Sequence, residues 1–278
     1  FAEACLIIML LAMTGSYSHA EPAASPEFGY LAPGITGGSY GGKRGGDGLM
    51  IVNYYLDYNF LVENEETNVG MILSTLQYDS NFEIFGGKWS GSVTFPTANY
   101  EDNNSIKLVN MMFVPVQLHW SFDDVDIQAR YAFHTDKGEP AGIAKEYWGH
   151  MLTGVLTHTL NELWSYTLAL GYEKRGDLSD EQDRTPGDIG IFEFAITRQF
   201  SSFYLSVNGY HNRQISDEKG SDAFQGERFY LTGLGGEIGL PIKNTNWFLN
   251  LRTFYEFESR NAPDDGLRTF IGAIYRFN

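Results

Sequence analysis

Cysteine is almost absent from this chain, since the 278 residues contain one, Cys5. It lies in an apolar run at residues 4–13, and small residues follow as far as Ala20. This pattern predicts a secretory signal peptide over residues 1–20, with cleavage after Ala20. Cleavage would remove the cysteine, which excludes an internal disulfide and a thiolate metal site. No cysteine lies next to the cleavage point, so a lipoprotein anchor is not expected.

Long apolar runs are also lacking. The run at residues 4–13 is the only one, and it is too short to cross a bilayer as a helix, which needs about 20 residues. The composition is nevertheless 43% hydrophobic and 15% aromatic, too apolar for a disordered chain. The sequence therefore indicates a folded protein that is not a helical membrane protein.

Basic residues are few, with 19 Lys and Arg against 35 Asp and Glu, for a formal net charge of -16. Such a charge repels phosphate backbones and excludes nucleic acid as an expected partner. Much of the acid lies between predicted strands, at residues 63–66, 177–181 and 264–265. We interpret these residues as solvated loop tips, with a divalent-cation site that bridges lipopolysaccharide as the alternative.

What the chain has in abundance is alternation. Every second residue from Trp247 to Phe257, and again from Leu267 to Phe277, is apolar or neutral, and a polar turn joins the two segments. A period of two places alternate side chains on opposite faces of a strand. Strand length, aromatic residues near the strand ends and the aromatic residue near the C-terminus favour a transmembrane barrel, with apolar faces toward lipid, over a soluble sandwich.

The same alternation predicts an all-β fold, a single up-and-down antiparallel transmembrane β-barrel of about twelve strands. The expected strands are 49–62, 69–78, 82–95, 109–120, 125–135, 147–160, 164–175, 189–200, 203–213, 228–240 and the two of the hairpin 247–277. Residues 21–48 form a Gly- and Pro-rich lead-in, and residues 49–278 form the barrel. Pro115 removes a ladder donor and should bend its strand or lie at a bulge.

The connections between these strands alternate in length. Short links at 79–81, 121–124, 161–163, 201–202 and 241–246 alternate with longer ones at 63–68, 96–108, 136–146, 176–188, 212–227 and 259–266. An up-and-down membrane barrel predicts such alternation, with short periplasmic turns and long external loops. All five tryptophans, Trp89, Trp120, Trp148, Trp164 and Trp247, fall within or at the end of a predicted strand, where an indole can lie at the headgroup level.

The lumen-facing set predicted by alternation contains acids and bases. It comprises Asp57, Asp126, Arg130, His134, Glu173, Arg175, Arg252, Glu256 and Glu258. Twelve strands enclose a narrower bore than a porin of 16–18 strands, so we expect these charges to define a constriction. The alternative is that they form ion pairs that only stabilise the interior.

Several segments of the chain resemble a known family. They are residues 47–55, residues 94–100, Pro115 to Trp120, Thr185-Pro186-Gly187-Asp188 and Gly209-Tyr210-His211-Asn212-Arg213-Gln214. From about Asp47 to the C-terminus the chain is similar to the outer-membrane family described as "putative MetA-pathway of phenol degradation". The resemblance implies a Gram-negative outer-membrane channel that admits small hydrophobic or aromatic compounds. The expected partners are that solute, outer-membrane lipids, lipopolysaccharide and, through the C-terminal strand, the barrel-assembly machinery.

Two other classes of function stay open. An outer-membrane lipid-modifying hydrolase would need a serine near a histidine at the lipid boundary, and the sequence shows no compact motif of that kind. A non-transporting surface or structural barrel is the second. We expect no catalytic residues and no cofactor. We also expect no metal, because His150 and His158 lie eight residues apart on one strand face, too far to share an ion.

Overall fold

The computed structural model describes residues 46–62, 65–100, 106–138, 146–178, 183–223, 228–260 and 266–277. The predicted signal peptide at 1–20, and the lead-in up to residue 45, lie outside these described residues. Within them, no helix is long and apolar enough to cross a membrane.

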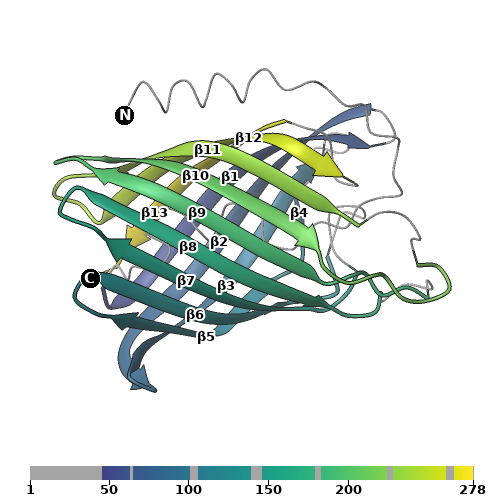
Figure 1. Cartoon of the computed structure of the whole chain (residues 1–278), viewed down its shortest axis with the longest axis horizontal. Coiled ribbons are helices and arrows are strands. Elements are labelled where there is room, and N and C mark those ends of the chain that lie inside the picture. Colours follow the sequence, from purple (N-terminus) through teal and green to yellow (C-terminus); the bar gives the residue numbers. More distant parts are fainter. Residues whose placement is uncertain are drawn as a thin grey trace.

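Within the described residues, thirteen strands form one antiparallel sheet that closes on itself (Figure 1). They are β1 (Gly48–Val62), β2 (Glu65–Ile84), β3 (Gly87–Tyr100), β4 (Ile106–Leu108), β5 (Met112–Ser121), β6 (Val125–His134), β7 (Gly149–Thr159), β8 (Trp164–Arg175), β9 (Ile189–Gln199), β10 (Tyr204–Gln214), β11 (Tyr230–Pro241), β12 (Trp247–Arg260) and β13 (Leu267–Arg276). Pairing of β1 with β13 joins the two ends of the sheet. The short β4 pairs with the last residues of β3, beyond the part of β3 that pairs with β5. The circuit therefore has twelve strands, and the predicted closed barrel is confirmed.

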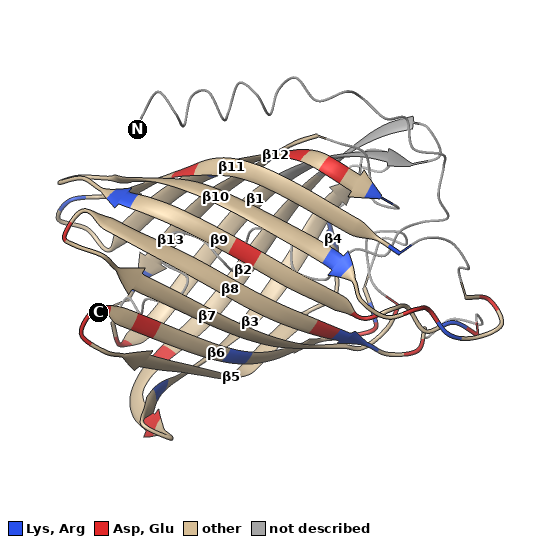
Figure 2. Ribbon diagram, in the orientation of Figure 1, with Lys and Arg blue, Asp and Glu red and all other residues tan. Residues whose placement is uncertain are grey.

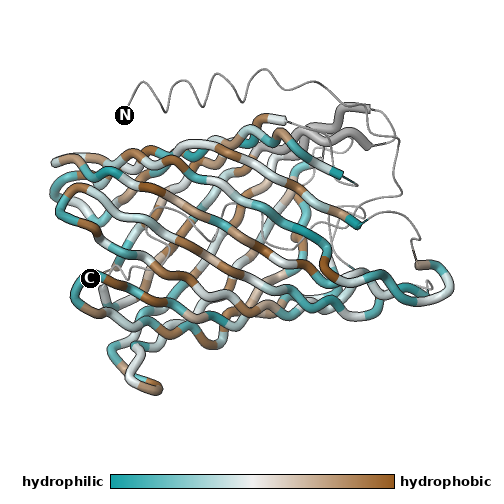
Figure 3. Tube along the Cα trace, in the orientation of Figure 1, coloured by the Kyte–Doolittle hydropathy of each residue, from teal (hydrophilic) through white to brown (hydrophobic). Residues whose placement is uncertain are grey.

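Side chains alternate between a buried inner face and an exposed outer face. In β7, Met151, Thr153 and Val155 are buried, whereas Leu152 between the first two is 58% exposed. In Figure 3, apolar and polar stretches are interspersed along the strands. Leu168 and Leu251 on the outer face are 42% and 44% exposed, far from the burial of a soluble sandwich core. The apolar outer face agrees with the transmembrane orientation predicted from alternation.

The connections differ at the two ends of the barrel. We call the end with the brief connections β5–β6, β7–β8, β9–β10 and β11–β12 the short-turn end, and the opposite end the long-loop end. The C-terminal end of the chain lies at the short-turn end (Figure 1), where the Phe277 N–H donates to the Leu49 carbonyl at 2.9 Å. Charged residues are frequent in the connections at the long-loop end (Figure 2).

Two predictions about the first strands are wrong. Residues 79–81 do not form a turn but lie inside β2, at an irregularity of the β2–β3 pairing. The turn falls at Phe85 and Gly86, whose φ angles of 53° and 74° match a two-residue hairpin turn with both residues left-handed. The predicted long link at 63–68 is also wrong, because β1 and β2 pair up to Val62 and Glu65.

Two bulges alter the register elsewhere. Pro115 lies in the irregular segment between Phe113 and Val116 of β5, as predicted for a residue without an N–H. In β12 the pairing skips Phe257, since Gly233 faces Glu256 while Thr232 faces Glu258. One extra residue on one strand shifts the following side chains to the other face.

Candidate functional site

The interior of the barrel is built around acid–arginine pairs between neighbouring strands. Glu237 of β11 and Arg252 of β12 face each other in the ladder, and 3.1 Å separates Glu237 Oε2 from Arg252 Nη2. Their side chains are 1% and 4% exposed. The carboxylate also accepts hydrogen bonds from the Tyr204 hydroxyl at 2.6 Å and from the amides of Asn208 and Asn250 at 2.9 and 3.1 Å. A buried ion pair with this many partners fixes two strands and one tyrosine in one arrangement.

Glycines of β11 make this arrangement possible. A Cβ at Gly239 would collide with the ring of Tyr204, and a Cβ at Gly233 would lie 2.6 Å from the ring of Tyr210. Both tyrosines come from β10 and lean over β11 because these positions lack side chains. The glycine-rich sequence of β11 therefore lets two aromatic rings reach carboxylates on β11 and β12.

A second pair lies nearer the long-loop end. Arg268 of β13 and Glu256 of β12 are joined by a 2.5 Å contact between Arg268 Nε and Glu256 Oε1, and the Tyr210 hydroxyl also donates to Glu256. Phe254 lies between Arg252 and Glu256 on the inner row of β12. Its ring centroid is 5.0 Å from that of Tyr210 and 5.9 Å from that of Phe270. Charge and aromatic surface thus alternate along this side of the lumen.

A third cluster lies at the long-loop ends of β6, β7 and β8. Glu173 accepts from Arg175 Nε at 3.4 Å and from the Tyr147 hydroxyl at 3.4 Å, and the Nε2 atom of His134 lies 3.8 Å from the same carboxylate. The Arg175 guanidinium also lies over the Tyr147 ring, 5.6 Å from its centroid. His134, Glu173 and Arg175 are buried.

The lumen is not uniformly polar, because an apolar cluster occupies part of it. Its buried members are Leu56, Ala98, Val109, Ile189, Ile191, Tyr210, Phe229, Leu231, Phe254 and Phe270. They come from β1, β3, β9, β10, β11, β12, β13 and the segments just before β5 and β11. Packing of residues from strands on opposite sides of the circuit places this cluster inside the barrel, and most of it lies toward the long-loop end.

The structure places most of the predicted lumen residues on the inner face. His134, Glu173, Arg175, Arg252 and Glu256 are buried there. Arg130 lies on the same inner row of β6 as His134 and is only partly buried, and its Nη2 atom has no hydrogen-bond partner among the described residues. Asp126 lies near the short-turn end, where it accepts from the Ser121 hydroxyl at 2.7 Å.

Two predicted residues do not join this set. Glu258 is exposed and lies opposite Thr232 on the outer face, because the Phe257 bulge precedes it. The side chain of Asp57 lies outside the described part of the structure. For residues 52–56 of β1 the faces are the reverse of those implied by an inward Asp57, since Val52 and Leu56 are buried inside and Tyr55 is 43% exposed outside.

Several interior residues were not predicted. Glu193, Glu237 and Arg268 are each at most 4% exposed, and Arg276 pairs with the buried Asp79 at 3.1 Å. A usable signal existed for the glutamates, because each is a lone acid among apolar or glycine residues of a strand. Within the described residues, no group of three or more His, Cys, Asp and Glu could hold a metal ion.

A closed twelve-stranded barrel with an apolar outer face, short turns at one end and charged pairs inside defines a bacterial outer-membrane β-barrel. The chain belongs to the family described as "Putative MetA-pathway of phenol degradation", whose model matches residues 53–266.

Solved structures share this fold. The COG4313 outer membrane channel from Pseudomonas putida F1 is 10% identical, with a TM-score of 0.71 over 89% of this chain and 100% of that one. The NanC porin, also 10% identical, has a TM-score of 0.52 over 82% of this chain and 100% of that one. The translocator domain of the autotransporter NalP from Neisseria meningitidis is 11% identical, with a TM-score of 0.50 over 83% and 89% of the two chains. No curated protein matches the sequence.

Proposed function

We propose that this barrel is a channel through which small hydrophobic or aromatic compounds cross the outer membrane. The observation that carries the proposal is the apolar and aromatic cluster inside the barrel, around Leu56, Phe254 and Phe270. A channel for hydrophilic solutes has a polar interior, whereas this lumen offers an apolar solute surface to contact on its way inward. The family description, which names phenol degradation, supports the same class of solute. The similar structures that are a channel and a porin support a channel, without indicating its solute.

Passage would run past the Arg268–Glu256 pair and along the apolar cluster toward the Glu237–Arg252 pair. In barrels of this class the long loops face the exterior and the short turns face the periplasm. A solute that enters at the long-loop end passes the Arg268–Glu256 pair, contacts Phe254 and Phe270 next and reaches the Glu237–Arg252 pair later. We assign the constriction to the inward charges, with Arg130 and Arg252 as its cations. Paired charged side chains that reach into a narrow bore leave little room for a continuous column of water. This disfavours wide, unselective diffusion.

A lipid-modifying hydrolase is less well supported. His158 contacts Asp124 at 3.0 Å and the Tyr166 hydroxyl at 3.2 Å, His150 contacts the Tyr131 hydroxyl, and His211 contacts the Thr232 hydroxyl. Acyl transfer by a serine nucleophile needs the base next to a serine hydroxyl. These contacts therefore favour the channel.

Uptake into proteoliposomes tests the proposal. Labelled toluene or phenol and a polar solute of similar size are offered to vesicles that contain the wild-type barrel, and to protein-free vesicles that measure leakage across lipid. We expect the barrel to accelerate uptake of the aromatic solute more than that of the polar one. Equal acceleration of both, or none above leakage, would refute the aromatic channel. Arg130→Ala and Arg252→Ala variants that conduct ions and take up solutes like wild type would refute the constriction.

A further inference from the structure

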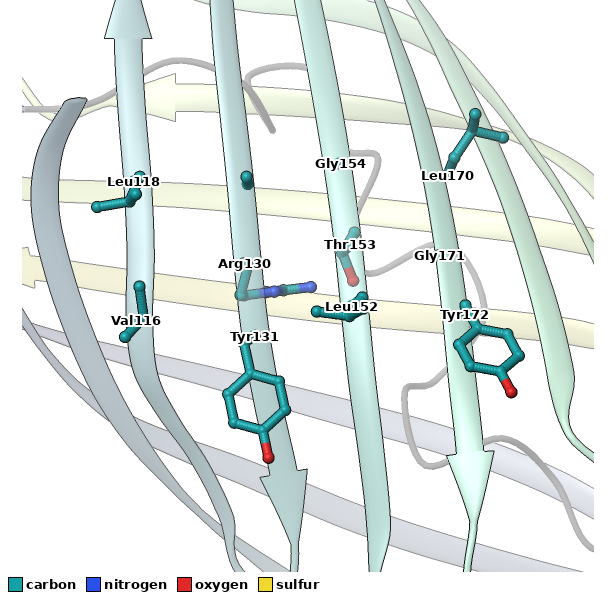
Figure 4. A pocket seen from close by; sticks show the side chains of 11 residues that line it. Val116, Leu118, Arg130, Tyr131, Leu152, Thr153, Gly154, Leu170, Gly171 and Tyr172 are labelled. Atoms are coloured by element: carbon teal, nitrogen blue, oxygen red, sulfur yellow. The ribbon is translucent and has the colours of Figure 1, made fainter. Parts of the chain in front are cut away.

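The outer wall of the barrel has a hollow where β6, β7 and β8 pass side by side (Figure 4). Its volume is about 540 Å³, within the ~300–1,000 Å³ of ordinary small-molecule sites. Ala129 and Gly154 are neighbours in the ladder and form its floor. A Cβ built on Gly154 would meet no atom within 4 Å, so this space opens outward.

The walls of the hollow are apolar and unusually exposed. Leu152 and Leu170 are 58% and 65% exposed, and the Tyr131 and Tyr172 rings flank them (Figure 4). In a membrane this surface faces acyl chains rather than water. A chain that fills the hollow would cover side chains that no other part of the described protein covers.

Polar groups border the hollow on the side of the long-loop end. His150 and Lys174 are partners in the β7–β8 ladder, and four residues along β7, about 13 Å at 3.3 Å per residue, separate His150 from Gly154. The Tyr131 hydroxyl is hydrogen-bonded to His150 at 2.8 Å, and the Tyr172 hydroxyl donates to Asp188 at 2.6 Å. An amphipathic ligand would therefore lie with its polar head at His150 and Lys174 and its tail over Gly154.

Lys174 is positioned to bind an anion. Its Nζ atom lies 3.7 Å from Asp188 Oδ2, too far for a hydrogen bond, and its side chain is 63% exposed. Asp188 already accepts from the Tyr172 hydroxyl and from the Arg175 N–H. The ammonium group of Lys174 thus lies at the membrane boundary and donates no hydrogen bond to the Asp188 carboxylate.

A second cation lies on the same outer surface. Gly190 of β9 is the ladder partner of Tyr172 on one side and of Arg213 on the other, and Gly190 places no side chain between them. Arg213 is exposed. Two interstrand spacings separate β8 from β10, about 10 Å, so Lys174 and Arg213 can engage two separate anionic groups.

From this geometry we infer that the outer face of β6–β8 binds a phosphorylated, acylated glycolipid of the lipid A type. One acyl chain of this glycolipid occupies the hollow over Gly154, and the phosphates of its head group contact Lys174 and Arg213. The long-loop end lies at the outer leaflet, where lipopolysaccharide is the anionic lipid, and the spacing of the two cations suits a head group with two phosphates better than a phospholipid with one.

Native mass spectrometry of the full-length mature barrel in detergent tests the assignment. Purified lipid A, its monophosphoryl form and phosphatidylglycerol are titrated separately. We expect lipid A to bind most tightly, and Lys174→Ala and Gly154→Leu each to weaken it by about threefold to tenfold. Arg198→Ala is the matched control, because Arg198 is an exposed outward cation of β9 at the short-turn end, packed over Trp164, and it should bind lipid A like wild type.

Heat-modifiable migration in gel electrophoresis shows that each variant has folded. Retention of lipid A by both variants at the wild-type level would overturn the site, and so would equal binding of phosphatidylglycerol. A protein dimer that Gly154→Leu abolishes, with no lipid bound to either species, would overturn it in favour of self-association.

Discussion

The buried pair of Glu237 and Arg252 gives the sharpest test of how the lumen is held together. Replacing Arg252 with methionine keeps most of the side-chain length and removes the charge. Glu237 is 1% exposed at its side chain, so its carboxylate would stay in place without a counterion. Removal of one partner from a buried ion pair costs about 3–5 kcal/mol.

The expected loss of unfolding free energy for Arg252→Met lies at the lower end of that range. Three neutral donors, Tyr204, Asn208 and Asn250, continue to solvate the Glu237 carboxylate after the arginine is gone. We therefore expect Arg252→Met to lower the free energy of unfolding by about 3 kcal/mol. The double variant Glu237→Gln/Arg252→Met removes both charges, and it should recover at least about half of that loss.

Urea unfolding of the barrel from lipid vesicles, followed by tryptophan fluorescence, measures these free energies. The double-mutant cycle is completed by Glu237→Gln alone. A loss below about 1 kcal/mol for Arg252→Met would show that the pair behaves like a solvent-exposed salt bridge. A double variant that loses the full sum of the two single losses would show that the two charges do not interact.

Three further predictions follow from other parts of the barrel. Gly239→Ala should destabilise the barrel by about 1–3 kcal/mol in the same unfolding assay, because the added methyl collides with a tyrosine ring; an unchanged midpoint would contradict this packing. Glu256→Gln should shift the ion selectivity of single channels toward anions, whereas Glu258→Gln should leave it unchanged, because only the first faces the lumen. In the loop after β10, the hydrogen bond that Arg228 donates to Asp217 at 2.9 Å holds the pKa of Asp217 below its ordinary value of 3.8. This contact therefore stabilises the loop at pH values above 3.8, and the stabilisation is lost as the pH falls through the lowered pKa. The protection of the loop amides, measured as hydrogen-exchange rates corrected for their intrinsic pH dependence, should therefore be constant from neutral pH to about pH 4 and fall only below it; a change in protection near pH 6 would contradict the assignment.

The architecture could be predicted from the sequence because two independent patterns agree. Alternation gives the strands, and the lengths of most connections give the order of turns and loops. Asp79 and its neighbours were mistaken for a turn because Asp, Ser and Asn are common turn residues. The real turn uses Phe85 in a left-handed conformation, which sequence preference does not suggest for a phenylalanine.

The lumen was harder to predict for a physical reason. Hydropathy assigns a strand to lipid or lumen only when the two environments differ, and part of this lumen is itself apolar. The apolar Val52 and Leu56 therefore led to the prediction that their side of β1 faces lipid, although it faces the lumen. In β6, Arg130 and His134 on one side led to the correct prediction of the lumen face. Cross-strand partners such as Glu237 and Arg252 depend on register, which no single strand encodes.

The bulge at Phe257 makes the length of β12 as informative as its composition. Substituting Phe257 changes one outward side chain, and deleting it would remove the extra residue while Glu258, now directly after the inward Glu256, kept its place opposite Thr232 on the outer face. The bulge is therefore a place where this strand can lose one residue without turning the charged side chains of Glu258 and Arg260 into the bore.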